Sequence, residues 1–175
     1  MVTVMAAGSQ VRLLDAADRA VLKRLRLASI DDAPQALLCR PEVERARSDE
    51  EWALLLNSKN WLAAFTDARS VGIAACVVDP ATGRRYVESM WVDPTHRRRG
   101  VAGQLLRAAG QLARSQGHGS IYLWVLVGNT AARDFYLRFG FSPTGVEQPI
   151  GDHHEMREEE FRLALTPPRR PAVIR

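Results

Sequence analysis

A short segment in the middle of the chain has the composition of an anion-binding loop. An apolar, strand-like stretch ends near position 92, and a helical pattern begins at Gly100. The first turn of that helix would hold Gly100, Ala102 and Gly103, and small residues let phosphate oxygens approach backbone N–H groups closely. A helix N-terminus also offers unpaired N–H groups and about half a positive charge. We therefore expect a phosphate or pyrophosphate on the backbone of residues 98–103.

Three consecutive arginines, at positions 97–99, precede this helix and add a cationic field. The P-loop pattern Gly-x4-Gly-Lys-Ser/Thr and the dinucleotide pattern Gly-x-Gly-x-x-Gly are both missing from the sequence. What the sequence has is Arg97-x-x-Gly100-x-Ala102. The phosphate ligand is therefore expected to belong to neither of those two classes.

A second constellation follows further along the chain, after the apolar run 121–127. It reads Asn129-x-x-Ala132-x-x-Phe135-Tyr136-x-x-x-Gly140-Phe141. A phenol is neutral at pH 7 and can donate a proton, so Tyr136 is a candidate general acid; the alternative is a packing aromatic on a short helix. Asn129 suits either a ligand contact or a turn.

Together with the strand end Met90-Trp91-Val92-Asp93-Pro94, these two segments resemble the GCN5-related N-acetyltransferase (GNAT) family. Members of that family use a Gln/Arg-x-x-Gly-x-Gly/Ala loop to cradle the pyrophosphate of acetyl-coenzyme A (acetyl-CoA). The resemblance covers about residues 84–145, with the three features in the family's order. The N-terminal half matches only in its order of elements.

The resemblance implies an α/β fold in a single domain: a mixed, mostly antiparallel sheet, splayed between two central parallel strands and flanked by helices. The pantetheine arm of acetyl-CoA would enter that gap, where a backbone N–H would polarise the thioester carbonyl. The family often carries a tyrosine where Tyr136 stands, and that tyrosine protonates the leaving sulfur. The implied cofactor contacts are Met90, Trp91, Val92, Arg97, Arg98, Arg99, Gly100, Val101, Ala102, Gly103, Asn129, Ala132 and Tyr136.

Glu88 is the candidate general base. Strand alternation predicts that it shares a face with Tyr86, Met90 and Val92. A carboxylate among apolar neighbours would have a raised pKa, which suits proton abstraction, often through a water. The alternative is an exposed Glu88, or one paired with a neighbouring arginine.

The acceptor pocket is expected between the first two helices, their connecting loop and the segment joining the last two strands. Carboxylates there could attract a cationic amine, and two adjacent histidines could line the pocket or act as base, although all of these residues also suit a solvated loop. The residues concerned are Asp31, Asp32, Glu147, Asp152, His153 and His154. The 4 His and 2 Cys show no zinc spacing, so no metal is expected.

Strand and helix signals alternate along the chain, as a mixed sheet with flanking helices requires. Ser48 begins a capping box, Thr130 is the expected cap of a short helix, and the run 121–127 is expected to be a central strand buried on both faces. Helices are expected at about 15–30, from 48, at 100–115 and at 130–138; strands are expected at 11–14, 61–66, 71–78, 85–92, 121–127, from 141 and at 159–165.

The length of 175 residues suits one domain, expected at 10–165 between a flexible leader, 1–9, and a flexible Pro/Arg tail, 166–175. No apolar run is long enough to span a membrane, and the N-terminus does not resemble a signal peptide. Cys39 and Cys76 are expected to be reduced thiols of a cytoplasmic protein.

The sequence thus predicts an N-acetyltransferase that uses acetyl-CoA and acts on an amine by direct attack in a ternary complex. The alternative is an acyl-CoA-binding module of the same fold without turnover. Despite the net charge of +4, no basic helix face with interleaved aromatics occurs, so neither a nucleic acid nor a membrane is expected as partner. A monomer and a homodimer both fit.

Overall fold

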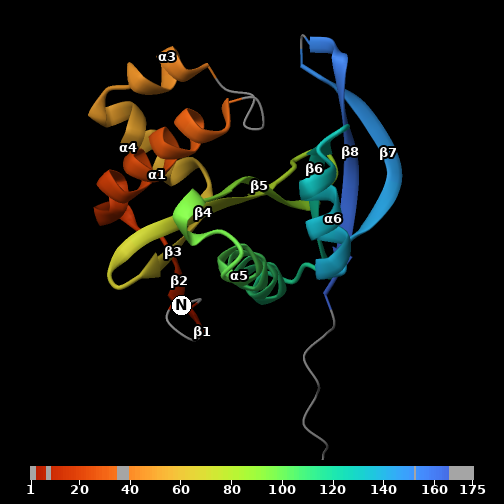
Figure 1. Ribbon diagram of the computed structural model, residues 1–175, viewed down its shortest axis with the longest axis horizontal. Coiled ribbons are helices and arrows are strands. Elements are labelled where there is room, and N and C mark those ends of the chain that lie inside the picture. Colours follow the sequence, from red (N-terminus) through yellow and green to blue (C-terminus); the bar gives the residue numbers. More distant parts are fainter. Residues whose placement is uncertain (1–2, 7–8, 35–39, 152, 166–175) are drawn as a thin grey trace, which may run out of the picture.

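The computed structural model describes residues 3–6, 9–34, 40–151 and 153–165, and these form a mixed sheet with helices on both faces (Figure 1). In this part of the chain the sheet has 8 strands in the order β1-β2-β3-β4-β5-β6-β8-β7. Neighbouring strands are antiparallel except β5 and β6, which are parallel. The strands are β1 (Thr3–Ala6), β2 (Ser9–Leu13), β3 (Asn60–Thr66), β4 (Arg69–Val78), β5 (Arg85–Val92), β6 (Ser120–Leu126), β7 (Ser142–Ile150) and β8 (His153–Ala164).

The helices divide between the two faces of the sheet. Helices α1 and α4 cover one face of β3 and β4 and α3 packs against α1, whereas α5 covers the other face and α6 lies beside β6 and β8 (Figure 1). None of the described helices is long and apolar enough to cross a membrane. The helical segments are η1 (Ala16–Asp18), α1 (Arg19–Asp32), α3 (Pro41–Arg45), α4 (Asp49–Ser58), η2 (Pro94–His96), α5 (Val101–Ser115) and α6 (Thr130–Phe139).

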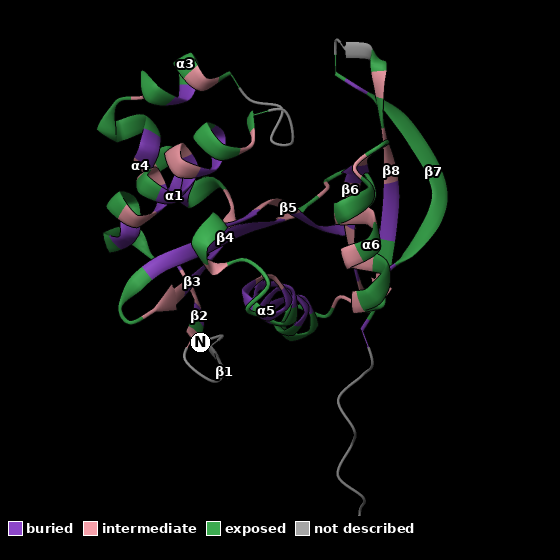
Figure 2. Cartoon of the chain, in the orientation of Figure 1, coloured by how far each residue is buried: buried purple, intermediate pink, exposed green. Residues whose placement is uncertain are grey.

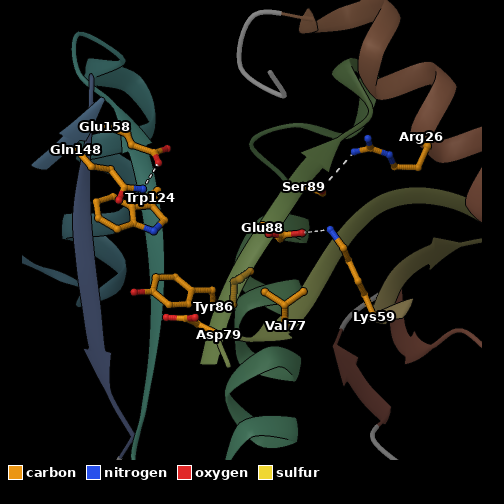
Figure 3. A pocket seen from close by; sticks show the side chains of 11 residues that line it. Arg26, Lys59, Val77, Asp79, Tyr86, Glu88, Ser89, Trp124, Gln148 and Glu158 are labelled. Carbon is orange, nitrogen blue, oxygen red and sulfur yellow. Dashed lines mark hydrogen bonds and ion pairs between the residues drawn. The ribbon is translucent and has the colours of Figure 1, made fainter. Parts of the chain in front are cut away.

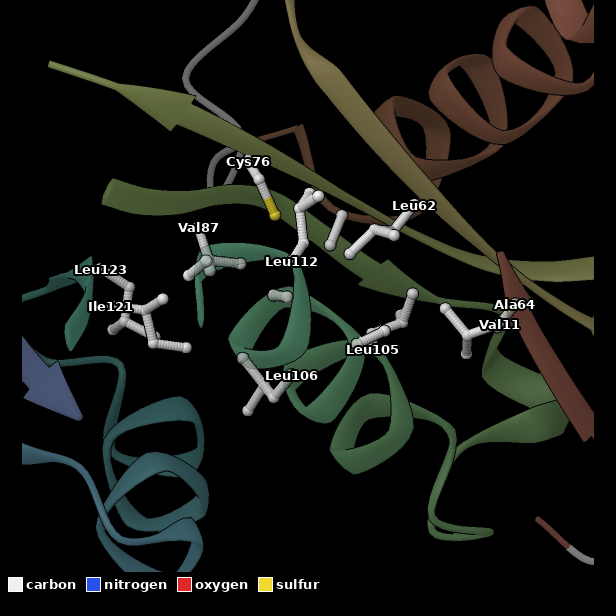
Figure 4. Close-up of a cluster of buried hydrophobic side chains, with 14 of the residues drawn as sticks. Val11, Leu62, Ala64, Cys76, Val87, Leu105, Leu106, Leu112, Ile121 and Leu123 are labelled. Carbon is white, nitrogen blue, oxygen red and sulfur yellow. The ribbon is translucent and has the colours of Figure 1, made fainter. Parts of the chain in front are cut away.

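Two apolar cores lie on opposite faces of the sheet. The core under α5 includes Leu105, Leu106 and Ile121, and nearly the whole inner side of α5 is buried (Figures 2 and 4). The core under α1 and α4 contains Trp52 and Trp61, both almost fully buried. Packing on both faces of the sheet holds β5 in place, and β5 carries many of the predicted site residues.

The sheet opens between its two parallel strands, as expected. Only Tyr86 and Tyr122 face each other in register across β5 and β6, and the strands diverge beyond that point. The prediction that the run 121–127 is buried on both faces is wrong. Burial alternates along β6, where Leu123 is buried and Trp124 half-buried, because the opening leaves one face of the strand partly exposed.

Strand β5 contains a bulge that changes which side chains share a face. Ile73 pairs with Trp91 and Ala75 with Glu88, so β5 holds one residue more than β4 over this stretch. The extra residue is Ser89, whose φ of 51° lies in the left-handed region and costs about 1–3 kcal/mol for a non-glycine residue.

The predicted alternation around Glu88 is therefore wrong beyond Ser89. Met90 and Val92 face the α5 core together with Val87, whereas Glu88 does not. One inserted residue shifts a period-2 pattern by one face, because successive strand residues point to opposite sides.

Several local predictions hold and two differ. Ser48 and Glu51 form the predicted capping box of α4. Helix α6 is capped by Asn129 instead of Thr130, since the Asn129 side chain accepts from the Ala132 N–H at 3.2 Å. Strand β1 lies within the segment expected as a loose leader, because main-chain pairing with β2 takes up its polar groups. The expected tail, 166–175, lies outside the described residues.

Candidate active site

The predicted anion loop ends at the start of α5. Gly100 is the N-cap, with a φ of 82° that favours glycine, and the helix begins at Val101. The loop and helix border a cleft of about 640 Å³, whose other wall comes from α6. All predicted cofactor contacts line this cleft except Arg99, which is exposed and lies outside it. The structure therefore brings together two segments that are well separated in the sequence.

Asp32 supports this cleft from behind. Its carboxylate accepts a hydrogen bond from Trp91 Nε1 at 2.8 Å and pairs with the Arg97 guanidinium. Arg97 Nε also donates to the Val92 carbonyl at 3.1 Å. Asp32, considered above as a carboxylate that could attract an acceptor amine, is thus paired within the protein, and both of its partners line the cleft predicted to hold the cofactor.

Tyr136 lies on α6 at the inner end of the cleft. Its hydroxyl is 3.6 Å from the Met90 sulfur, and the rings of Phe135 and Phe141 meet its ring edge-on at 5.2 and 5.6 Å. Burial raises the pKa of Tyr136 to about 12, so the phenol keeps its proton at neutral pH. Both a general acid and a packing aromatic would have these surroundings.

Glu88 has a cationic partner instead of apolar surroundings. It forms an ion pair with Lys59 across from β5, and the side chains of Lys59 and Glu88 are 30% and 40% exposed (Figure 3). The predicted partner for a paired Glu88 was a neighbouring arginine. Lys59 takes that place because it directly precedes β3, and the sheet brings this end of β3 near Glu88: Asn60 pairs with Cys76 of β4, and the adjacent Ala75 pairs with Glu88.

A second cavity, of about 630 Å³, takes lining residues from both β5 and β6, the two strands that diverge (Figure 3). It is lined by Arg26, Lys59, Val77, Asp79, Tyr86, Val87, Glu88, Ser89, Trp124, Gln148 and Glu158. A smaller cavity of about 150 Å³ shares Ser89 and Trp124 with it and shares Met90 and Tyr136 with the cleft. The smaller cavity therefore borders both the cleft and the second cavity.

Several residues of the second cavity were not anticipated. The rings of Tyr86 and Trp124 stack at 6.3 Å with an interplanar angle of 3°. Glu158 accepts from Gln148 Nε2 at 2.7 Å, and both side chains project beside Trp124 (Figure 3). The sequence signal that could have placed Glu158 is alternation along β8, which pairs it with Leu126 at the open end of β6.

Asp31 and Glu147, two of the carboxylates considered for the acceptor, do not line the second cavity. Asp31 pairs with Arg45 at the surface, and Glu147 pairs with Arg157 at 3.1 Å. His153 and His154 belong to β8, but the structure does not describe their side chains, and Asp152 lies outside the described residues. Within the described part of the chain, no group of three or more His, Cys, Asp or Glu is arranged to hold a metal ion.

The chain is similar in sequence to characterised acetyltransferases over part of its length. It is 31% identical to the streptothricin acetyltransferase of Streptomyces lavendulae over 94 residues, which are 54% of this chain and 50% of that protein. It is 37% identical to N-acetyltransferase 8F1 of Rattus norvegicus over 79 residues, 43% of this chain and 36% of that protein. The matched stretch spans about half or less of these relatives.

Solved structures share the fold across almost the whole chain. The ribosomal-protein-S5-alanine acetyltransferase of Vibrio fischeri superposes with a TM-score of 0.77 at 12% identity, over 94% of this chain and 97% of that one. The protein yncA of Salmonella typhimurium, solved with its cofactor acetyl-CoA, gives 0.71 at 17% identity, over 96% and 100%. The sequence model of the acetyltransferase (GNAT) family matches residues 26–141, and the chain belongs to that family.

Proposed function

We propose that this protein transfers an acetyl group from acetyl-CoA to a primary amine by direct attack in a ternary complex. The observation that carries the proposal is the arrangement of two cavities around one phenol. A smaller cavity borders both the cleft with the anion loop and the second cavity, and Tyr136 lines the cleft and this smaller cavity. Two substrates entering from opposite sides would meet beside its hydroxyl.

The residues of the cleft suit the donor. Backbone N–H groups of residues 98–103 would bind the pyrophosphate, with Arg97 and Arg98 supplying positive charge. Strand β5 beyond its bulge would bind the pantetheine arm, since β6 has diverged and no longer takes up its main-chain groups. A backbone N–H of this stretch would then polarise the thioester carbonyl.

The acetyl transfer needs one bond made, one broken and two protons moved. The neutral amine nitrogen attacks the carbonyl carbon, and the carbon–sulfur bond breaks. Tyr136 gives its proton to the leaving thiolate, while Glu88 takes a proton from the attacking nitrogen, directly or through a water. Glu88 can do so once its Lys59 partner has moved aside.

The second cavity suits a cationic amine as acceptor. Its carboxylates include Asp79 and Glu158, and its aromatic wall consists of Tyr86 and Trp124. Ammonium groups bind favourably to carboxylates and to the faces of aromatic rings. The competing proposal is a module that binds acyl-CoA without turnover. The placement of the Tyr136 hydroxyl where the cleft and the smaller cavity meet favours the enzyme.

Calorimetric titration with acetyl-CoA at physiological salt tests the donor site. We expect micromolar-range binding that Gly100→Glu abolishes. Gly83→Glu is the matched control: both glycines have positive φ, 82° and 68°, and neither would have a neighbour within 4 Å of an added Cβ, but Gly83 lies outside the cleft. Equal loss in both variants, or no binding by the unaltered protein, would contradict the donor site.

A screen of amines by thiol release then separates the two proposals. Release of coenzyme A that depends on both the amine and acetyl-CoA supports acetyl transfer. Binding of acetyl-CoA without release, over amines that range from small diamines to peptides and aminoglycosides, would favour the binding module.

A further inference from the structure

The bulge at Ser89 lies where β5 borders the proposed binding cavities. Ser89 lines both the second cavity and the smaller cavity that borders the donor cleft. The next residue, Met90, touches the Tyr136 hydroxyl and faces the α5 core. The conformation of Ser89 therefore sets where the main chain of β5 lies relative to Tyr136.

A buried arginine from another element holds Ser89. Arg26 of α1 donates from Nη1 to the Ser89 Oγ at 3.2 Å and from Nη2 to Glu44 Oε1 at 3.2 Å (Figure 3). The side chains of Arg26 and Glu44 are each only 8% exposed. Among the described residues Arg26 Nε has no hydrogen-bond partner.

The stability of the fold does not by itself explain the buried Arg26–Glu44 ion pair. Removing two charges from water costs about as much as their attraction returns, so replacing such a pair by apolar side chains is often neutral or stabilising. The pair does, however, place a guanidinium against a serine whose backbone is strained. The planar guanidinium of Arg26 has several N–H donors in a fixed arrangement. Because the buried Glu44 carboxylate orients it, it is well suited to hold the Ser89 hydroxyl in one position.

We propose that Arg26, oriented by Glu44, is a positioning residue that acts through Ser89. It holds the main chain of the β5 bulge at a fixed position relative to Tyr136. This inference rests on the proposed acetyl transfer for its kinetic readout. Arg26 does not line the cleft proposed for acetyl-CoA, although it does line the second cavity proposed for the amine. Its effect must therefore appear in the rate of the chemical step more than in the affinity for acetyl-CoA.

A double-mutant cycle on Arg26→Met and Ser89→Ala tests the coupling. Each single variant should lower kcat by about tenfold or more, because misplacement of reacting groups by a fraction of an ångström to 1 Å costs up to about a hundredfold. The KM for acetyl-CoA should change by less than about threefold. The double variant should be no slower than the worse single variant, since both break the same link.

Ser89→Gly supplies a rescue that a merely structural role would not allow. Glycine adopts positive φ without steric cost, so the bulge should persist without its anchor. In the Arg26→Met background, Ser89→Gly should restore most of kcat. Arg47→Met is the matched control, because Arg47 pairs with the same Glu44 oxygen at 3.3 Å and has no contact with Ser89. It should leave kcat unchanged.

Additive losses in the cycle, full kcat in Ser89→Ala, or equal loss in Arg47→Met would overturn the proposal. If no amine is acetylated by the unaltered protein, the proposed function fails separately, and crystal structures of Ser89→Gly and Arg26→Met decide the inference. We expect Ser89 to leave the left-handed region in Arg26→Met, and a positive φ retained there would refute the link. If Arg26→Met does not fold, Arg26→Lys takes its place in both measurements.

Discussion

The Tyr136 hydroxyl and the Met90 sulfur lie 3.6 Å apart and join α6 to β5 across the opening of the sheet. These two residues come from two of the three segments that carry the family resemblance, and the structure brings them together where the cleft and the smaller cavity meet. Tyr136 and Met90 both line the cleft and the smaller cavity, so a group transferred at this point would lie between the two.

Removing the Tyr136 hydroxyl should slow the chemical step selectively. Tyr136→Phe keeps the ring among Phe135 and Phe141, so folding and acetyl-CoA affinity should be retained. The kcat should fall by about 10²- to 10⁴-fold, as for loss of a general acid. Tyr122→Phe removes a phenol outside the cleft and serves as control in the same thiol-release assay. Unchanged turnover in Tyr136→Phe would leave the residue a packing role.

Substitutions of the two partners of the Lys59–Glu88 pair should change different kinetic parameters. Lys59→Met removes a resident cation that competes with the acceptor, so the KM for a cationic amine should fall by about two- to fivefold, and kcat should not fall because Glu88 is freed from its partner. Glu88→Gln should lower kcat by about a hundredfold with acetyl-CoA affinity intact. Steady-state kinetics with one cationic amine measure both. If Glu88→Gln turns over like the unaltered protein, Glu88 is not the base.

Stability should fall steeply in alkaline solution. Burial is the main cause that raises the pKa of both Tyr86 and Tyr136 to about 12, against about 10 in an unfolded chain. Between these values the unfolded chain has lost protons that the folded one retains, so the stability that these two tyrosines contribute is fully present below pH 10 and is lost as pH rises towards 12. Melting temperatures from pH 8 to pH 11 check the sign, and Tyr136→Phe should flatten the slope.

The core under α5 should account for a large part of the stability. Leu105 is fully buried there, so Leu105→Ala should lower the free energy of unfolding by about 2–5 kcal/mol (Figure 4). Leu54 of α4 is 69% exposed, and Leu54→Ala should cost less than about 0.5 kcal/mol. Urea denaturation of the two variants measures the difference, and similar losses would contradict this assignment of the core.

The elements that could be predicted are those whose signals are local. Gly100 and Gly140 mark the start of α5 and the end of α6, because left-handed φ values of 82° and 111° are available to glycine at little cost. The capping box at Ser48 and the turn before β5 depend on neighbours within four residues. These features need no knowledge of the rest of the chain.

The cleft was predictable for a related reason. Its contacts come mostly from two continuous segments, each with its own sequence pattern. The sequence therefore predicted the residues of both walls of the cleft, but not that the two walls lie close together. Arg99 was included only because it belongs to the arginine run, and the loop turns it away from the cleft.

The tertiary structure alone decided the face of Glu88, the partners of Asp32 and the lining of the second cavity. A bulge shifts the register between two paired strands by one residue. Register depends on how the strands pair, and no single position in the sequence shows which residue is the extra one. The Arg26–Ser89 and Lys59–Glu88 contacts join positions 63 and 29 apart in the chain. Sequence patterns report what neighbouring residues favour, whereas such contacts arise only when the sheet and its helices have packed together.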